Sequence, residues 1–225
     1  KILETAGLIA KKIQKNKNIN PLNILNQDIS RVGALDLKFY NKKFDNDYNK
    51  QLKKHIDKTK PVVFLMGLDE INFSTFENAF VVYLGHHGDV SASIADIILP
   101  TPAYTEKSST YMNIEGRVIQ TTKCHNPIGE AKEEWKIFRV LSDLFEKNLN
   151  FNNLGELRNE LTSTYGQFAL LNEVNSIGEI TFAKNNKIEN IKIKYNIENF
   201  YMTDSISRSS ETMAKCTKDI LNKAA

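Results

Sequence analysis

The side chains that could do chemistry gather between residues 85 and 125 of this 225-residue chain. Neighbouring His86 and His87, with Asp89 close by, could bind a metal ion through imidazole and carboxylate groups. Successive residues on a strand usually point to opposite sides, and no cysteine stands near this run. We therefore expect hydrogen bonding at a strand-end loop, or contact with a neighbouring subunit, instead of a metal site.

Two cysteines are the only thiols in the sequence, Cys124 and Cys216. Cys124 precedes His125, which raises the possibility of a catalytic thiol, but nothing in the sequence supplies a base or an anion hole beside it. A packed cysteine is the expectation. An iron–sulfur cluster needs about four closely spaced ligands, nearly always thiolates. Two distant cysteines cannot hold one, so we expect no cluster and no other cofactor within these residues.

Three carboxylates, Asp96, Glu106 and Glu115, could act as acid–base groups. Lys107 and Arg117 stand within the same stretch. Carboxylates in purely structural networks are common, so we expect an ion-pair network that fastens the loop over 104–117. The sequence therefore predicts no catalytic, cofactor-binding or metal-binding residue in this chain.

Composition narrows the class of protein. Hydrophobic residues make up 41% and charged residues 25% of the chain, which is typical of a globular fold. The net charge of +3 gives no electrostatic reason to expect binding to nucleic acid or to an anionic membrane. The longest apolar run, Val62 to Met66, is far shorter than the roughly 20 residues that span a bilayer. The chain opens on Lys1 without a signal peptide, and we expect it to be a piece of something longer.

Three short apolar runs predict the central structure: 62–66, 80–85 and 97–100. Such runs, joined by short connections, indicate a parallel α/β sheet with loops at the carboxyl ends of its strands. Each run is expected to be buried on both faces. Apolar residues at helical spacing predict helices over 2–13, 21–33, 131–147, 154–161 and 207–221, and a surface helix within 40–60. The capping-box spacing of 74–77 predicts a short helix from Ser74, and alternation of apolar and polar residues predicts a half-buried strand over 191–197.

One motif resembles the molybdopterin oxidoreductase superfamily. Its skeleton is Ala95-Asp96, three apolar residues and Pro100, then Glu106, and then Thr110-x-x-Asn113-x-Glu115-Gly116-Arg117. Pro100 ends a strand because it cannot donate to a ladder. Gly116 allows a tight turn before Val118.

A second motif, 199–208, reads Asn-Phe-Tyr-Met-Thr-Asp-Ser-Ile-Ser-Arg and is followed by Thr212-Met-Ala-Lys-Cys216. It resembles the C-terminal part of the large iron–sulfur subunits (the G type) of respiratory complex I, in their mitochondrial and alphaproteobacterial form. The Gly-His-His-Gly-Asp run at 85–89 and the stretches 20–25 and 32–37 resemble the same family.

The resemblance implies a structural segment of a complex I peripheral-arm subunit. The intact subunit would carry 2Fe-2S and 4Fe-4S clusters in an N-terminal part that these residues lack. Electrons from NADH would pass along those clusters to quinone, coupled to proton translocation. The implied partners are that N-terminal part and other peripheral-arm subunits. The implied location is the matrix side of the mitochondrial inner membrane, or the cytoplasmic side of a bacterial inner membrane.

The resemblance also implies a domain division and leaves one alternative. The expected fold class is α/β: a parallel sheet with flanking helices, resembling a degenerate molybdopterin oxidoreductase domain, plus a mainly helical C-terminal appendage. Residues 1–126 would form the end of the α/β domain, 127–150 a closing amphipathic helix, and 151–225 the appendage. The alternative is the C-terminal part of a catalytic molybdopterin oxidoreductase. Few strands are predicted after Gly129, whereas cofactor-binding members usually have a strand-rich C-terminal domain.

Overall fold

The computed structural model describes residues 2–13, 22–26, 31–39, 48–68, 72–174, 197 and 199–221. The chain forms two compact units. The first comprises Lys1–Tyr40, Ser109–Thr121 and Asn150–Asn196. The second comprises Asn41–Ser108, Thr122–Leu149 and Ile197–Ala225, and it contains the predicted sheet.

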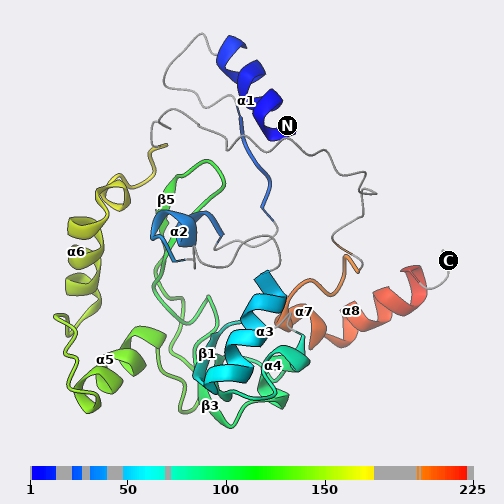
Figure 1. Cartoon of the computed structure of the whole chain (residues 1–225), viewed down its shortest axis with the longest axis vertical. Helices are drawn as coiled ribbons and strands as arrows, with labels where there is room; N and C mark the ends of the chain where they lie inside the picture. Colours follow the sequence, from blue (N-terminus) through cyan, green and yellow to red (C-terminus); the bar gives the residue numbers. More distant parts are fainter. Residues whose placement is uncertain are drawn as a thin grey trace. The chain divides into compact units, whose positions relative to one another are not determined.

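A three-stranded parallel sheet forms the centre of the second unit (Figure 1). Its strands β1 (Val62–Met66), β2 (Phe80–Gly85) and β3 (Ile97–Pro100) lie side by side in that order. Val62 pairs with Phe80, and Gly85 with Pro100. The three apolar runs therefore form the predicted parallel sheet, which confirms the α/β fold class.

One face of this sheet is covered. Leu65, Val81 and Tyr83 point to this face, and all three are buried. Partly buried apolar residues from the turn after η1 (Phe73–Thr75), and from α4 (Val90–Ser93) and the residues after it, pack against them. Helix α3 (Tyr48–Thr59) contacts η1 and buries Ile56, so the surface helix predicted within 40–60 is confirmed.

The opposite face is covered unevenly. Val82 and Leu84 of β2 are buried there, while Phe64 of β1 meets Phe138 of α5 (Glu134–Leu144) at 5.5 Å between ring centroids. The predicted burial on both faces holds for β2 but is wrong for β1 and β3. In the described part of the chain these two strands are the sheet edges, and most of their residues are exposed or half-buried.

The predicted C-terminal helix is divided into shorter pieces. These are α7 (Ser205–Arg208), α8 (Glu211–Cys216) and a π-helical turn η3 (Thr217–Leu221). The Ser210 side chain accepts a hydrogen bond from Met213 N and starts α8 afresh. Serine hydroxyl groups compete for the backbone hydrogen bonds that would continue a helix. The single apolar stripe over these residues therefore does not produce one continuous helix.

The first unit is built around a hairpin of β4 (Thr110–Met112) and β5 (Val118–Gln120). Met112, Val118 and Phe168 form its buried core. Partly buried side chains from α2 (Arg31–Asp36), α6 (Leu154–Thr164) and the residues next to these helices pack against that core, and η2 (Gly166–Ala169) contributes Phe168. Helix α1 (Ile2–Ile13) forms as predicted, with Ala10 buried and Ile9 and Ile13 exposed.

Two local predictions are wrong in this structure. The helix predicted over 21–33 is absent from 22–26, and α2 begins at Arg31, so Gly33 lies inside it. The Asn26 amide donates to the Ile24 carbonyl, a local bond that favours non-helical backbone. The short helix predicted from Ser74 is a 3₁₀ turn that begins one residue earlier, because Asn72 caps it. The strand predicted over 191–197 lies outside the described residues, apart from Ile197.

Candidate functional site

Asp89 lies in the loop at the carboxyl end of β2. In open α/β sheets, ligands bind at this end of the strands. One carboxylate oxygen of Asp89 accepts a hydrogen bond from Val90 N at 2.7 Å and caps α4. Within α4, the buried Ser91 hydroxyl group donates to the Leu68 carbonyl oxygen, beyond the end of β1. The loop is therefore held by bonds to its own backbone and to its neighbour.

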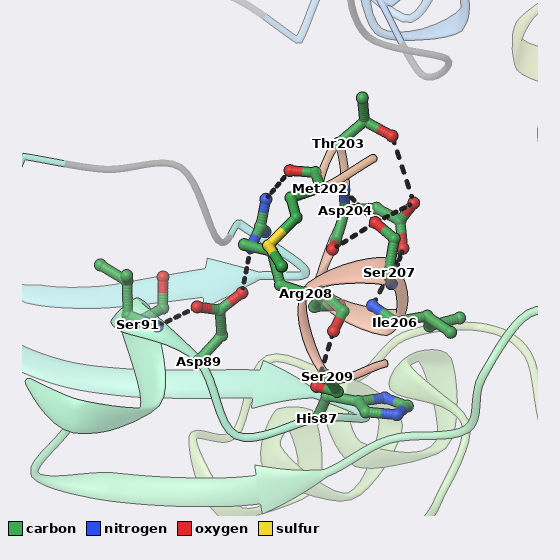
Figure 2. A network of polar contacts seen from close by, with 12 residues as sticks. His87, Asp89, Ser91, Met202, Thr203, Asp204, Ile206, Ser207, Arg208 and Ser209 are labelled. Atoms are coloured by element: carbon green, nitrogen blue, oxygen red, sulfur yellow. Dashed lines mark hydrogen bonds and ion pairs between the residues drawn. The ribbon is translucent and has the colours of Figure 1, made fainter. Parts of the chain in front are cut away.

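Arg208 reaches this loop from α7 (Figure 2). Its Nε donates to Asp89 Oδ2 at 2.8 Å, and its Nη1 donates to the Met202 carbonyl oxygen at 3.3 Å. The side chains of Arg208 and Asp89 are only 23% and 13% exposed. This pair, here called the Asp89–Arg208 clamp, joins residues 119 positions apart. It joins the 85–89 run to the 199–208 motif, both of which resemble the same family.

Asp204 orders the backbone from which Arg208 projects. Its carboxylate accepts from Ile206 N and Ser207 N, while the Ser207 hydroxyl oxygen accepts from Asp204 N, which completes a capping box. The hydrogen bond from Ser207 N, with smaller contributions from the Ser207 hydroxyl, Ile206 N and the charge of Arg208, outweighs burial and lowers the pKa of Asp204. The carboxylate is thus ionised where α7 needs an acceptor, and α7 presents Arg208 to Asp89 (Figure 2).

His86 and His87 do not point apart as predicted. Their Nδ1 atoms lie 2.6 Å apart, and the ring planes meet at 87°. The strand has ended at Gly85, so the alternation of a strand no longer applies. The buried Tyr83 donates its hydroxyl proton to the His87 carbonyl oxygen at 3.2 Å. The expected hydrogen bonding at a strand-end loop is therefore present.

The acidic residues fasten backbone at separate places. Asp96 accepts from Val81 N at 2.7 Å, and the buried Glu106 accepts from Ala103 N at 3.0 Å. Lys107 pairs with Glu134 of α5 at 2.5 Å. The loop-fastening interpretation is confirmed, but a single joint network is wrong, because each group has a separate partner.

The Asn113–Arg117 motif forms the β4–β5 turn. Asn113 Oδ1 accepts from Glu115 N and Arg117 N, both at 2.9 Å, and Gly116 has φ +80°, where a side chain would be strained. Arg117 donates to the Asn172 carbonyl oxygen and lies 3.6 Å from Glu115. Its side chain is 36% exposed, so the predicted fastening role holds but the pair is not buried.

The donor atoms present do not suit an iron–sulfur cluster. Cys124 is exposed, which corrects the expectation of a packed thiol, and Cys216 is half-buried. His125 contacts the Asn126 carbonyl oxygen at 2.9 Å. Across the described ranges, no three His, Cys, Asp or Glu side chains are grouped so that they could hold a metal ion.

Taken together, the site's groups are matched to each other. Asp89 is bonded to Arg208 and Val90, and the Nδ1 atoms of the two histidine rings lie next to each other. The chain's own C-terminal segment lies against the strand-end loop where this class of sheet binds ligands (Figure 2). The arrangement can hold two segments together, and sequence reasoning missed it. No local pattern links Asp89 with Arg208, although both lay in motifs that had been singled out.

Two profiles of known protein families match this chain. The profile described as Molybdopterin oxidoreductase matches residues 1–144, which is more than half of the chain. The chain belongs to the molybdopterin oxidoreductase family. A second profile, for the C-terminal region of the G-type subunits of NADH-ubiquinone oxidoreductase, matches residues 173–216. The resemblance inferred from the motifs is confirmed.

Curated relatives share much of the sequence. The chain is 39% identical to the NADH-ubiquinone oxidoreductase 75 kDa subunit of Reclinomonas americana, over 96% of its own length and 31% of the relative. It is 41% identical to the mitochondrial 78 kDa subunit of Candida albicans, covering 93% of the chain and 30% of the relative. It is 37% identical to the G-type subunit of the NADH-quinone oxidoreductase of Rickettsia bellii, covering 87% and 27%.

The chain thus spans about 30% of the length of these relatives. They are mitochondrial and bacterial subunits of one kind of oxidoreductase. Within the described residues, no helix has both the length and the apolar character needed to cross a bilayer.

Proposed function

We propose that this chain is the C-terminal part of the large iron–sulfur subunit of respiratory complex I, and that its role there is structural. It supports the part of the subunit that passes electrons from NADH through iron–sulfur clusters to quinone, coupled to proton translocation. The names and the identities of the relatives support this proposal. The subunit would lie in the peripheral arm, on the matrix side of the mitochondrial inner membrane or the cytoplasmic side of a bacterial one.

The observation that carries the structural role is the Asp89–Arg208 clamp. A carboxylate and a guanidinium group at a strand-end loop could have served a substrate, but here each is bonded to the other. Both are mostly shielded from solvent. Asp89 and Arg208 therefore direct their charges at each other and hold two segments of the fold together.

The proposal assigns no catalytic, metal-binding or cofactor-binding role to any residue of the chain. The iron–sulfur clusters of the intact subunit would be held by its N-terminal part. The partners of this chain would be that N-terminal part and other peripheral-arm subunits. In this proposal 1–126 complete the α/β domain, 127–150 close it, and 151–225 form the C-terminal appendage. The two family matches, over 1–144 and 173–216, support a change of character between them.

The family match leaves a catalytic molybdopterin oxidoreductase as the alternative. The decisive experiment is to purify the intact subunit and to measure molybdenum, pterin and iron by elemental analysis and fluorescence after acid oxidation. The proposal expects iron from the N-terminal part without stoichiometric molybdenum or pterin. Molybdenum and pterin at one equivalent per subunit would support the catalytic alternative and refute the structural role.

A further inference from the structure

The outer edge of β1 is an apolar strand edge without a partner among the described residues. Val62, Phe64 and Met66 are 58%, 38% and 52% exposed, whereas Leu65 on the covered face is 3% exposed. Val62–Met66 contains no charged residue. Natural edge strands normally carry a lysine, a proline or a bulge that prevents pairing with other chains. This strand carries none of these within its span.

Three residues of β1 direct their backbone N–H and C=O groups toward the free edge of the sheet. Pro61 O and Gly67 N bond to β2 on either side of the strand, and alternate residues of a parallel strand bond to the same neighbour. Val62, Phe64 and Met66 therefore turn their N–H and C=O groups away from β2. The three exposed side chains belong to the three residues with outward-facing backbone groups.

The opposite edge of the sheet differs. Strand β3 ends at Pro100, which cannot donate to a further strand, and the Pro100 carbonyl oxygen accepts from Lys132 N. Parallel sheets are normally covered on both faces, and sheets commonly have about four to six strands. The described sheet has three strands, with β1 and β3 at its edges, and the β3 edge carries the bond from Lys132 N.

We propose that an extended segment from the upstream part of the same subunit pairs with the outer edge of β1 and covers Val62, Phe64 and Met66. This inference rests on the proposed function, because it takes the chain as the C-terminal part of a longer subunit. About 70% of the length of the relatives lies outside the match to this chain, and the profile of the subunit's C-terminal region matches residues 173–216. That upstream polypeptide supplies the partner: a strand with apolar side chains toward the exposed face.

Site-specific photo-cross-linking tests the proposal in the intact subunit in its own membranes. Benzoylphenylalanine is placed at Phe64 or Met66, and in a matched control at Phe73, which is 45% exposed in η1. After irradiation, cross-linked peptides are identified by mass spectrometry. The expected result is that probes at 64 and 66 label a segment upstream of Lys1, and that the probe at 73 does not label that segment.

Phe64 contacts Phe138, so labelling of α5 from position 64 is expected in any case. Labelling of another subunit, of a second copy or of other residues of this chain in place of the upstream segment would overturn the proposal. So would equal labelling of the upstream segment from Phe73, or no labelling at 64 and 66. Co-purification of the labelled subunit with complex I is a separate measurement, and it tests the proposed function. A subunit absent from complex I would refute the proposed function, while the cross-linked peptide would still decide which segment covers β1.

A second measurement keeps the proposal testable if the probe perturbs folding. Phe64→Lys with Met66→Lys places charges on the edge, and Phe73→Lys is the control. A modest loss of stability commonly changes cellular abundance several-fold, so the double variant should lower the assembled subunit about fivefold or more relative to the control. Equal amounts of assembled subunit in both variants would contradict edge pairing.

Discussion

Replacing Arg208 with alanine is the most direct test of the Asp89–Arg208 clamp. The change removes the donor to Asp89 Oδ2 and the second bond to the Met202 carbonyl oxygen. Breaking a fully buried pair costs about 3–5 kcal/mol, and an exposed pair contributes about 0.2–1 kcal/mol. The clamp side chains are 23% and 13% exposed, and Asp89 keeps its bond from Val90 N. We therefore expect a loss of about 2 kcal/mol.

That loss should be local, because the clamp joins α7 to a sheet that has its own core. Amide hydrogen exchange of the assembled subunit measures local opening directly. A loss of about 2 kcal/mol corresponds to about 30-fold faster exchange, expected for the amides of α7 and α8 and not for those of β2. Arg208→Lys should restore little, because an ammonium group cannot reproduce the two directed bonds of the guanidinium group.

A double-mutant cycle separates the pair from general damage. Arg208→Ala, Asp89→Ala and the double variant should give a coupling of about 1–2 kcal/mol, within the range found for interacting residues. The matched control is Arg139→Ala with Asp143→Ala, because this pair lies on one helix and Asp143 is 55% exposed. Its coupling should be about 0.3–0.5 kcal/mol. Equal coupling in the two cycles, or unchanged exchange in α7, would refute the clamp.

Three further predictions concern single positions. Gly85→Ala should destabilise the second unit by about 1–3 kcal/mol in urea unfolding, because a Cβ there would overlap the Tyr83 ring; unchanged stability would contradict that packing. Asp204→Ala should lower stability by about 0.5–2 kcal/mol at neutral pH through the lost cap. Folding lowers the pKa of Asp204, so the contribution of this carboxylate to stability is fully present above the unfolded pKa of about 3.9. That contribution declines as the pH falls through the folded pKa. The stability difference between the unaltered protein and Asp204→Ala should therefore vanish in strong acid. Arg117→Ala should cost about 1 kcal/mol, less than Arg208→Ala, because its Glu115 partner is 50% exposed; a larger loss would refute that order.

Local sequence patterns, formed by residues that are close together along the chain, predicted much of the fold. The continuous apolar runs identified β1, β2 and β3, and helical spacing identified α1, α5 and α6. The same reasoning failed where side chains bond to nearby backbone. Asn26 and Ser210 each contact backbone locally, and the helices predicted across them are absent or divided.

The site was predicted in parts but not as an arrangement. The motifs around Asp89 and Arg208 were both found, yet their contact joins positions 119 residues apart, which no local period can indicate. Exposure of β1 was missed for a related reason. An apolar run predicts that a strand is covered in the assembled protein, and it does not say which part of the polypeptide covers it.

We propose that this chain supports complex I without taking part in its chemistry. The most direct test measures, in the same membranes, the amount of assembled complex on native gels and the rate of NADH oxidation with quinone per assembled complex, for Arg208→Ala against the unaltered subunit. A structural role predicts less assembled complex with a near-normal rate per complex. Full assembly with a lost rate would refute the structural role and place Arg208 in the chemistry of the complex.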